Sequence, residues 1–142
     1  MRFKTDMTDV DEGSVFELVP QGVYPVRVNL VEDNHSQAGD PMPKVTFEII
    51  LGEHAGRMLF DRILFPEKGS KAEKILGRSK HFLHCIGEPH EDNFEVVTEN
   101  WENRQCLAIV KHRDYESKTY ANIVGYDFLD KDVKPETDGI PF

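Results

Sequence analysis

Aromatic and basic side chains alternate along two stretches of this chain. Phe60 and Arg62 stand two residues apart in one stretch, and Tyr115 and Tyr120 flank a short turn among lysines and arginines in the other. Residues two apart on a strand share a face, and rings beside cations are what a site for single-stranded nucleic acid requires. Each ring has an ordinary half-buried role in a sheet as its alternative. With two cations from the outward faces of earlier strands, the predicted DNA-binding residues are Arg27, Lys44, Arg57, Phe60, Arg62, Lys111, Arg113, Tyr115, Lys118 and Tyr120.

Residues typical of catalysis are few. The sequence has no glycine-rich phosphate loop, no GxSxG motif and no HExxH motif, so we expect neither enzyme activity nor a cofactor. His81 and Cys85 stand four residues apart on a predicted helix, with His84 and His90 nearby, and this spacing is compatible with zinc. Because His81 and His84 project away from the predicted buried face of that helix, we favour solvent-exposed histidines over a metal site.

The last 16 residues form an acidic segment with an apolar end. Residues 127–142 carry five acidic and two basic side chains, and their glycine and prolines argue against regular structure. We predict a disordered tail whose end enters a pocket on a partner protein, while its carboxylates meet basic residues there. The predicted partner-binding residues are Asp138, Ile140, Pro141 and Phe142.

The net charge of −9, from 17 basic and 26 acidic side chains among 142 residues, is unevenly distributed. Residues 1–21 and 127–142 contribute −3 each and residues 88–102 contribute −6, which leaves +3 for the rest. This balance excludes a uniformly basic DNA coat but allows one basic face. Without a long apolar stretch or a signal-peptide pattern, and with two cysteines, we expect a cytoplasmic protein that does not contact membranes.

The first half of the chain shows the alternation of β-strands. Strand patterns begin at Gly22, run over Lys44–Leu51 and run again over Arg57–Phe65. Leu30 and Leu51 have the inward phase of their strands, and Pro25 indicates an edge or a bulge. Phe47, Phe65 and Trp101 are expected in the core or as loop anchors.

The second half begins with a helical period. Apolar residues at three- and four-residue steps predict a helix from an N-cap at Ser70 to a stop at Gly87, with Ile75 on its buried face. Strand patterns follow at 104–112 and from Lys118 to about Tyr126. Three strands, a helix and two strands fit an all-β, five-stranded OB-fold barrel of the Greek-key type, with a split α+β roll as the alternative. We assign residues 1–126 to this domain, with 1–17 as a candidate flexible arm, and 127–142 to the tail.

Several short motifs resemble known single-stranded DNA-binding proteins. The end Asp138-Gly139-Ile140-Pro141-Phe142 resembles the Asp-Asp-Ile-Pro-Phe tip of the bacterial proteins, with Gly139 in place of the second Asp. The body resembles the bacteriophage proteins through Val19-Pro20-Gln21-Gly22-Val23-Tyr24, Gly52-Glu53-His54-Ala55-Gly56-Arg57 and Leu59-Phe60-Asp61. This resemblance over residues 18–126 implies an OB fold, sequence-tolerant binding of single-stranded DNA, and recruitment of replication and recombination proteins by the tail.

Two other function classes stay open at this point. An acidic DNA mimic, or a protein-interaction module acting on a DNA-handling enzyme, suits the charge of −9 and would bind no DNA. A metal-dependent nuclease would need clustered carboxylates on the barrel, and the sequence offers no such cluster. The sequence leaves open whether the protein forms a homo-oligomer.

Overall fold

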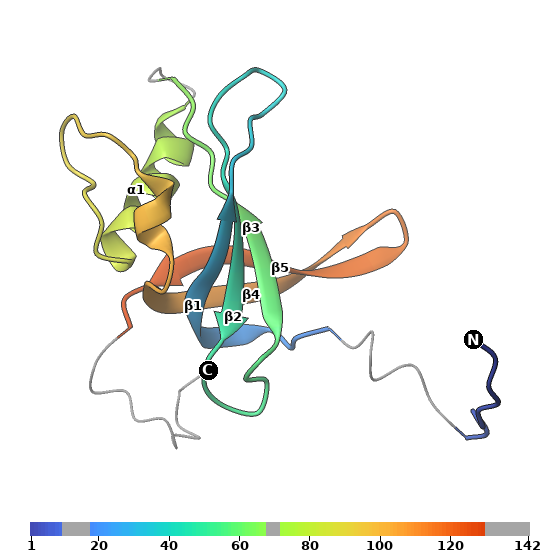
Figure 1. Cartoon of the computed structure of the whole chain (residues 1–142). Coiled ribbons are helices and arrows are strands. Elements are labelled where there is room, and N and C mark those ends of the chain that lie inside the picture. Colours follow the sequence, from blue (N-terminus) through green and yellow to red (C-terminus); the bar gives the residue numbers. More distant parts are fainter. Residues whose placement is uncertain (10–17, 68–71, 130–142) are drawn as a thin grey trace.

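Within the residues that it describes, the computed structural model has five antiparallel strands in one sheet and a single α-helix (Figure 1). The structure describes residues 1–9, 18–67 and 72–129, so the tip residues predicted to bind a partner lie outside the described residues. The mostly β architecture agrees with the prediction. The elements are β1 (Gly22–Glu32), β2 (Lys44–Ile49), β3 (Met58–Arg62), α1 (Glu73–Cys85), the 3-10 helix η2 (Thr98–Trp101), β4 (Gln105–Tyr115) and β5 (Lys118–Asp127).

The strand order in the sheet is β3-β2-β1-β4-β5, so β1 is the central strand. The β1–β2–β3 meander stands upright in Figure 1, and the β4–β5 hairpin crosses behind it and extends beyond it. The sheet therefore curls, which brings the edge strands β3 and β5 into contact. Tyr126 on β5 donates a hydrogen bond to Asp61 on β3, but no backbone ladder joins these two strands in the described part of the chain. We call the facing edges of β3 and β5 the seam.

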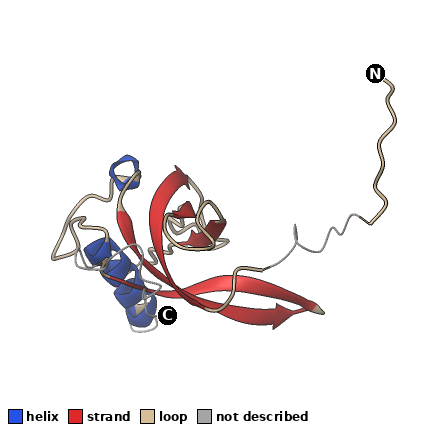
Figure 2. Cartoon of the chain, turned by 90° about the horizontal axis from the view of Figure 1, so that it is seen from below, coloured by secondary structure: helices blue, strands red, loops and turns tan. Residues whose placement is uncertain are grey.

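The core lies inside the curled sheet and is covered by α1 and η2 (Figures 1 and 2). Val45, Phe47 and Ile49 of β2 are fully buried, as their alternation predicts. Phe82 of α1 stacks edge-on against Phe47, with 6.1 Å between ring centroids. Trp101 is fully buried as well, so it is a core residue and offers no surface to a ligand.

The prediction that Leu30, near the end of β1, faces the core was wrong. Leu30 is 45% exposed because β1 has a bulge between Val28 and Leu30, and the shifted register pairs Leu30 with Thr46 on the outer face. Pro25 lies in the central strand and not at an edge. Its carbonyl accepts the Ile50 N–H at 3.0 Å, one residue beyond the end of β2, so the missing proline N–H falls where the ladder already stops.

The C-terminal end of α1 lies where the sequence predicted it. Gly87 has φ +78°, and the N–H groups of Gly87 and Glu88 donate to the carbonyls of His84 and Leu83. These two bonds form a Schellman motif, the common glycine stop of a helix. Ser70 lies outside the described residues, and Ala72 occupies the N-cap position.

Two apolar residues with the predicted inward phase are not buried. Ile75 is exposed because the buried residues of α1 begin at Ser79, so the first turn of the helix lies beyond the covered part of the sheet. Leu51 is half-buried because β2 ends at Ile49. Of the described helices, none combines the length and the apolar composition that crossing a membrane requires.

Candidate nucleic-acid interface

Two adjoining clefts run along the seam. The first cleft, of about 400 Å³, is lined by Lys44, Phe60, Asp61, Arg62, Lys111, His112, Arg113, Asn122, Ile123 and Val124. The second cleft, of about 440 Å³, is lined by Leu18, Val19, Arg57, Met58, Leu59, Phe60, Arg62, Tyr120, Ala121 and Asn122. Phe60, Arg62 and Asn122 line both, so the two clefts form one continuous depression across β3 and the β4–β5 hairpin.

Strand register places rings and cations side by side in this depression. Lys44 is paired with Arg62 across β2 and β3, and its ammonium lies 5.5 Å from the centre of the Phe60 ring. On the other wall, Arg113 is directly opposite Tyr120 across β4 and β5. Residues directly opposite in an antiparallel pair share a face and touch. Phe60 is 56% exposed and Tyr120 45% exposed, so both rings are open to solvent beside a positive charge.

The structure brings together seven of the ten predicted DNA-binding residues. The residues that line one or both clefts are Lys44, Arg57, Phe60, Arg62, Lys111, Arg113 and Tyr120. Tyr115 and Lys118 are opposite each other at the tip of the β4–β5 hairpin, outside the clefts but on the same face as Arg113 and Tyr120. Arg27 lines neither cleft. Its guanidinium bonds Glu48 at 2.6 Å, so its charge is already compensated.

The hairpin that carries Tyr115 and Lys118 turns in two residues. Glu116 has φ +48° and Ser117 has φ +67°, which is the geometry of a type I′ turn. Thr119 donates a hydrogen bond to Asp114 at 2.6 Å across the ladder next to the turn. This tight closure keeps the two strands paired to the tip, and it holds Tyr115 and Lys118 on one face of the ribbon.

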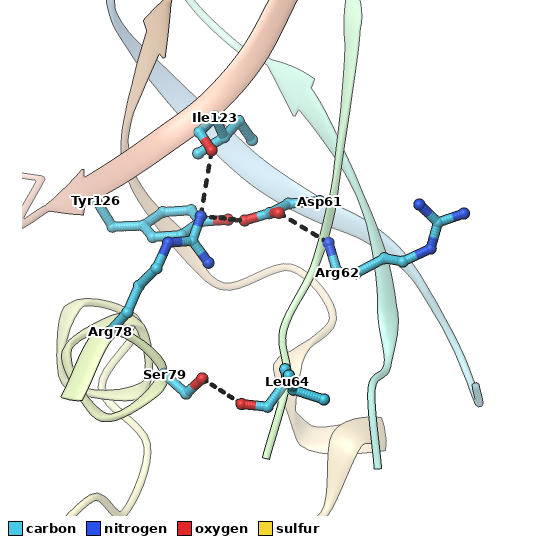
Figure 3. Close-up of polar contacts among 7 residues, drawn as sticks. All are labelled: Asp61, Arg62, Leu64, Arg78, Ser79, Ile123 and Tyr126. Carbon is cyan, nitrogen blue, oxygen red and sulfur yellow. Dashed lines mark hydrogen bonds and ion pairs between the residues drawn. The ribbon is translucent and has the colours of Figure 1, made fainter. Parts of the chain in front are cut away.

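Sequence reasoning missed a polar group beneath the first cleft, which we call the Asp61 cluster: Asp61, Arg78 and Tyr126 (Figure 3). One carboxylate oxygen of Asp61 accepts hydrogen bonds from the Tyr126 hydroxyl at 2.5 Å and from Arg78 Nη2 at 2.7 Å. The same Arg78 nitrogen donates to the Ile123 carbonyl at 3.2 Å. The cluster therefore joins β3, β5 and α1 at one point.

Protonation states in the Asp61 cluster follow from its burial. Desolvation, followed by the adjacent Asp61 carboxylate, raises the pKa of Tyr126 well above its ordinary value. Burial alone would lower the pKa of Arg78, but its charge interactions and hydrogen bonds with Asp61 and Tyr126 together outweigh burial, and the net shift is upward. Tyr126 is thus a neutral donor and Arg78 a cation under physiological conditions. The signal for this cluster in the sequence was Asp61 itself, an acid between Phe60 and Arg62 in the Leu59-Phe60-Asp61 motif.

A family model described as a protein of unknown function (DUF669) matches residues 3–135. The chain belongs to the DUF669 family. No curated protein matches the chain. The DUF669 match includes every strand and helix described above and both clefts, and it ends before Asp138 and the three residues Ile140, Pro141 and Phe142.

The opening motif of this DUF669 chain has a structural role. Tyr24 donates its hydroxyl to the Pro20 carbonyl at 2.6 Å. His112 of β4 lies 2.8 Å from the Val19 carbonyl through Nε2, and its backbone N–H donates to the Gln21 side chain at 2.8 Å. These contacts fasten residues 19–21 against β4, where Val19 forms part of the wall of the second cleft. The motif positions a wall and places no ring or cation of its own in the clefts.

The glycine motif of the DUF669 chain likewise shapes the chain. Gly52 has φ +89° and Gly56 has φ +92°, values that disfavour a residue with a side chain. The Gly56 N–H donates to the Ile49 carbonyl at 2.7 Å, which closes the turn between β2 and β3. Arg57, the last residue of this motif, follows the turn and lines the second cleft.

The residues whose spacing is compatible with zinc, His81, His84, Cys85 and His90, lie on and just after α1 and line neither cleft. His84 stacks on His90 with 4.0 Å between ring centroids, and Phe128 contacts the rings of His81 and His84 edge-on. Within the residues that the structure describes, no three potential ligand side chains are grouped so as to hold a metal ion. Burial raises the pKa of the Cys85 thiol to about 11, and it also raises that of Cys106, so both thiols are protonated at neutral pH.

Proposed function

We propose that this protein binds single-stranded DNA without strong sequence preference. The observation that carries the proposal is the pair of adjoining clefts, which gather two exposed rings and five cations on a chain whose net charge is −9. The cations are Lys44, Arg57, Arg62, Lys111 and Arg113. Rings stack on any base, because every base has a π-face, and cations track the phosphates. A surface of this composition suits a flexible strand whose bases are unstacked and accessible.

The proposal includes a five-stranded OB-fold barrel. Its support is the strand order, the helix between β3 and β4, and the contact between β3 and β5 at the seam. OB folds bind oligonucleotides on the face of their second and third strands and on the loops after their first and fourth strands. Lys44, Phe60 and Arg62 belong to β2 and β3, and Arg113 precedes the β4–β5 turn. The candidate interface thus has the location expected of this fold.

We extend the proposal to the tail and to the biological role. The terminal residues Asp138, Ile140, Pro141 and Phe142, by their resemblance to the bacterial tip, would recruit replication and recombination proteins of a bacteriophage system. The acidic charges of residues 127–142 keep the tail away from DNA phosphates and leave its end available to a partner. Deletion of residues 130–142 should abolish this recruitment, and it should leave affinity for single-stranded DNA unchanged or higher. A marked loss of DNA affinity after this deletion would place the tail in the DNA site instead.

A direct binding experiment tests the DNA-binding proposal. Fluorescence anisotropy with labelled single-stranded and double-stranded oligonucleotides, with and without Mg²⁺, should show binding to the single strand, weaker binding to the duplex and no cleavage. The logarithm of the affinity should fall linearly with the logarithm of the salt concentration, with a slope of about −0.7 for each phosphate contact. Affinity for single strands that does not change with salt would contradict the proposal.

The rival function is that of an acidic DNA mimic or protein-interaction module. It is favoured by residues 88–102, which carry six acidic side chains and no lysine or arginine. Two large apolar side chains of this segment, Phe94 and Val96, are exposed. This rival predicts no anisotropy change with either oligonucleotide at any salt concentration, so the same experiment separates the two functions.

A further inference from the structure

At the seam, the facing edges of β3 and β5 are not joined by backbone hydrogen bonds of a ladder. The backbone groups of Arg57, Ile63 and Phe65 bond toward β2 and the loop before it. Since backbone polar groups alternate direction along a strand, those of Phe60, Arg62 and Leu64 point toward β5. In a ladder the two strands would lie about 4.8 Å apart, which leaves no space for a ring between them. Here a cleft of about 400 Å³ occupies that position.

Side chains satisfy several of the edge groups that a ladder would have used. The Arg62 N–H donates to Asp61 Oδ1 at 2.8 Å, and the Leu64 carbonyl accepts the Ser79 hydroxyl at 2.6 Å. On the opposite edge, the Ile123 carbonyl accepts Arg78. The Leu64 and Ile123 carbonyls are partly withdrawn from water and need such partners. Side chains thus replace part of the hydrogen bonding that a ladder between β3 and β5 would supply.

Asp61 links this arrangement to the candidate interface. Its carboxylate is 17% exposed and is directed at Tyr126 and Arg78, whereas the Arg62 side chain extends away from the cluster (Figure 3). Phe60 and Arg62 precede and follow Asp61 on β3, so both face the other side of the strand from it. Fixing the carboxylate of Asp61 consequently fixes the part of β3 that presents this ring and this cation.

We propose that Asp61, Tyr126 and Arg78 are positioning residues that set the distance between the two walls of the first cleft, and so hold Phe60 and Arg62 for single-stranded DNA. This inference rests on the proposed function. A side-chain link of this length keeps β3 and β5 close enough to contact one strand from both sides, and it prevents the ladder that would close the cleft. None of the three residues needs to touch the DNA.

Tyr126→Phe tests the inference because it removes one hydroxyl and leaves the buried ring. We expect affinity for a single-stranded oligonucleotide to fall by up to about tenfold, because DNA binding must then supply the order at the seam that this hydrogen bond to a charged group supplies in the unsubstituted protein. Asp61→Asn removes the charge opposite Arg78 and replaces one of the two acceptor oxygens with an amide donor. Affinity for the oligonucleotide should therefore fall in this variant by at least as large a factor. Both affinities are measured well below the melting temperature of each variant.

Ser79→Ala is the matched control. It removes another buried hydroxyl that bonds the β3 end of the seam, at Leu64, and it lies outside both clefts. A purely structural role for Tyr126 predicts that both variants lower the melting temperature and leave affinity unchanged. A positioning role predicts that Tyr126→Phe alone weakens binding. Equal affinities for these two variants overturn the inference.

A distance measurement without DNA separates this inference from the proposed function. Spin labels on Glu53→Cys, in the β2–β3 turn, and Lys118→Cys, at the hairpin tip, report the relative position of the two walls by double electron–electron resonance. The native Cys85 and Cys106 are buried, and the protein without added cysteines shows whether they take up label. We expect Tyr126→Phe to broaden the distance distribution and Ser79→Ala to leave it unchanged. An unchanged distribution in Tyr126→Phe overturns the inference, whereas absent DNA binding by the unsubstituted protein overturns only the proposed function.

Discussion

Two carboxylate–arginine pairs in this molecule have nearly the same geometry and different surroundings. Asp61 and Arg78 are 2.7 Å apart at the seam, and Glu88 and Arg104 are 2.8 Å apart where the chain leaves α1 and later enters β4. Both carboxylates are largely buried. The neighbours of Asp61 on β3 are an exposed ring and an exposed cation, whereas the segment between Glu88 and Arg104 places the fully buried Trp101 in the core.

The difference shows how one interaction serves two purposes. At Glu88 the pair closes a long segment over the core, and the apolar area that it helps to bury stabilises the fold. At Asp61 the pair holds a strand whose adjacent ring, Phe60, remains in water and contributes little to folding. Under the proposed function, the pair at Asp61 supports side chains of the binding surface, which must be held in place by the residues behind them. Substitutions should therefore separate cleanly into those that affect stability and those that affect DNA binding.

The largest effect should be the loss of folding stability in Trp101→Ala. Removing this fully buried ring should lower the free energy of unfolding by about 3–5 kcal/mol, measured by urea denaturation. Because Trp101 lines neither cleft, DNA affinity measured below the melting temperature should not change. A loss of affinity greater than the loss of folded protein would show that the two regions are coupled.

Charge reversal in the first cleft should give the next largest effect. The double variant Arg62→Glu/Lys111→Glu removes two cations from facing walls, so affinity should fall about 100-fold and the salt slope should become shallower by about two contacts. Lys74→Glu/Lys80→Glu on α1 changes the net charge equally and is the matched control. Equal losses in the two double variants would mean that net charge, and not the cleft, governs binding.

Phe60→Ala should also weaken DNA binding, but less than the charge reversal. Loss of one stacking ring should weaken binding by about 1–3 kcal/mol, with little change in melting temperature because the ring is half in water. Leu30→Ala is the control, since Leu30 is a similarly exposed apolar residue on the outer face of the same sheet but lines neither cleft. The stacking interpretation fails if anisotropy titrations give the two variants the same affinity.

Arg104→Met should have the smallest of these effects. It should lower the stability of the fold and leave DNA affinity unchanged. Glu88 would lose its partner while remaining largely buried, which should cost about 1–2 kcal/mol because Arg104 is itself partly exposed and water replaces some of the interaction. Urea denaturation measures this cost, and Glu88→Gln/Arg104→Met should recover part of it. If Arg104→Met weakened DNA binding as strongly as Phe60→Ala does, the purely structural role of the Glu88–Arg104 pair would be contradicted.

Local patterns predicted most of the elements. The strands expected at 104–112 and from Lys118 to about Tyr126 are observed as β4 and β5, and Gly87 ends α1 as expected. Alternation and the helical period depend on neighbouring residues, so sequence alone reveals them. The bulge of β1 was missed because Leu30 continues the two-residue alternation of Val26 and Val28, although it is the following residue, Val31, that packs against the core. Leu30 was therefore assigned to the wrong face.

The sequence predicted which rings and cations line the candidate site. It did not predict the Asp61 cluster that holds them. Rings and cations on strands identified seven residues that line the clefts, because strand phase decides which side chains share a face. Arg27 lines neither cleft and is paired with Glu48, which is 21 residues away in sequence. Tyr126 is separated from Asp61 by 65 residues. Contacts of this kind depend on tertiary structure, which no local pattern encodes.

The central position of β1 has a consequence for how the chain folds. β1 pairs with β2 across a sequence distance of about 20 residues and with β4 across about 80, and the entropy cost of closing a loop grows with its length. We expect the β1–β2–β3 meander and the β4–β5 hairpin to form early as separate units, and their union along β1 to limit the folding rate. The side chains that meet at the seam would then be among the last to reach their native partners.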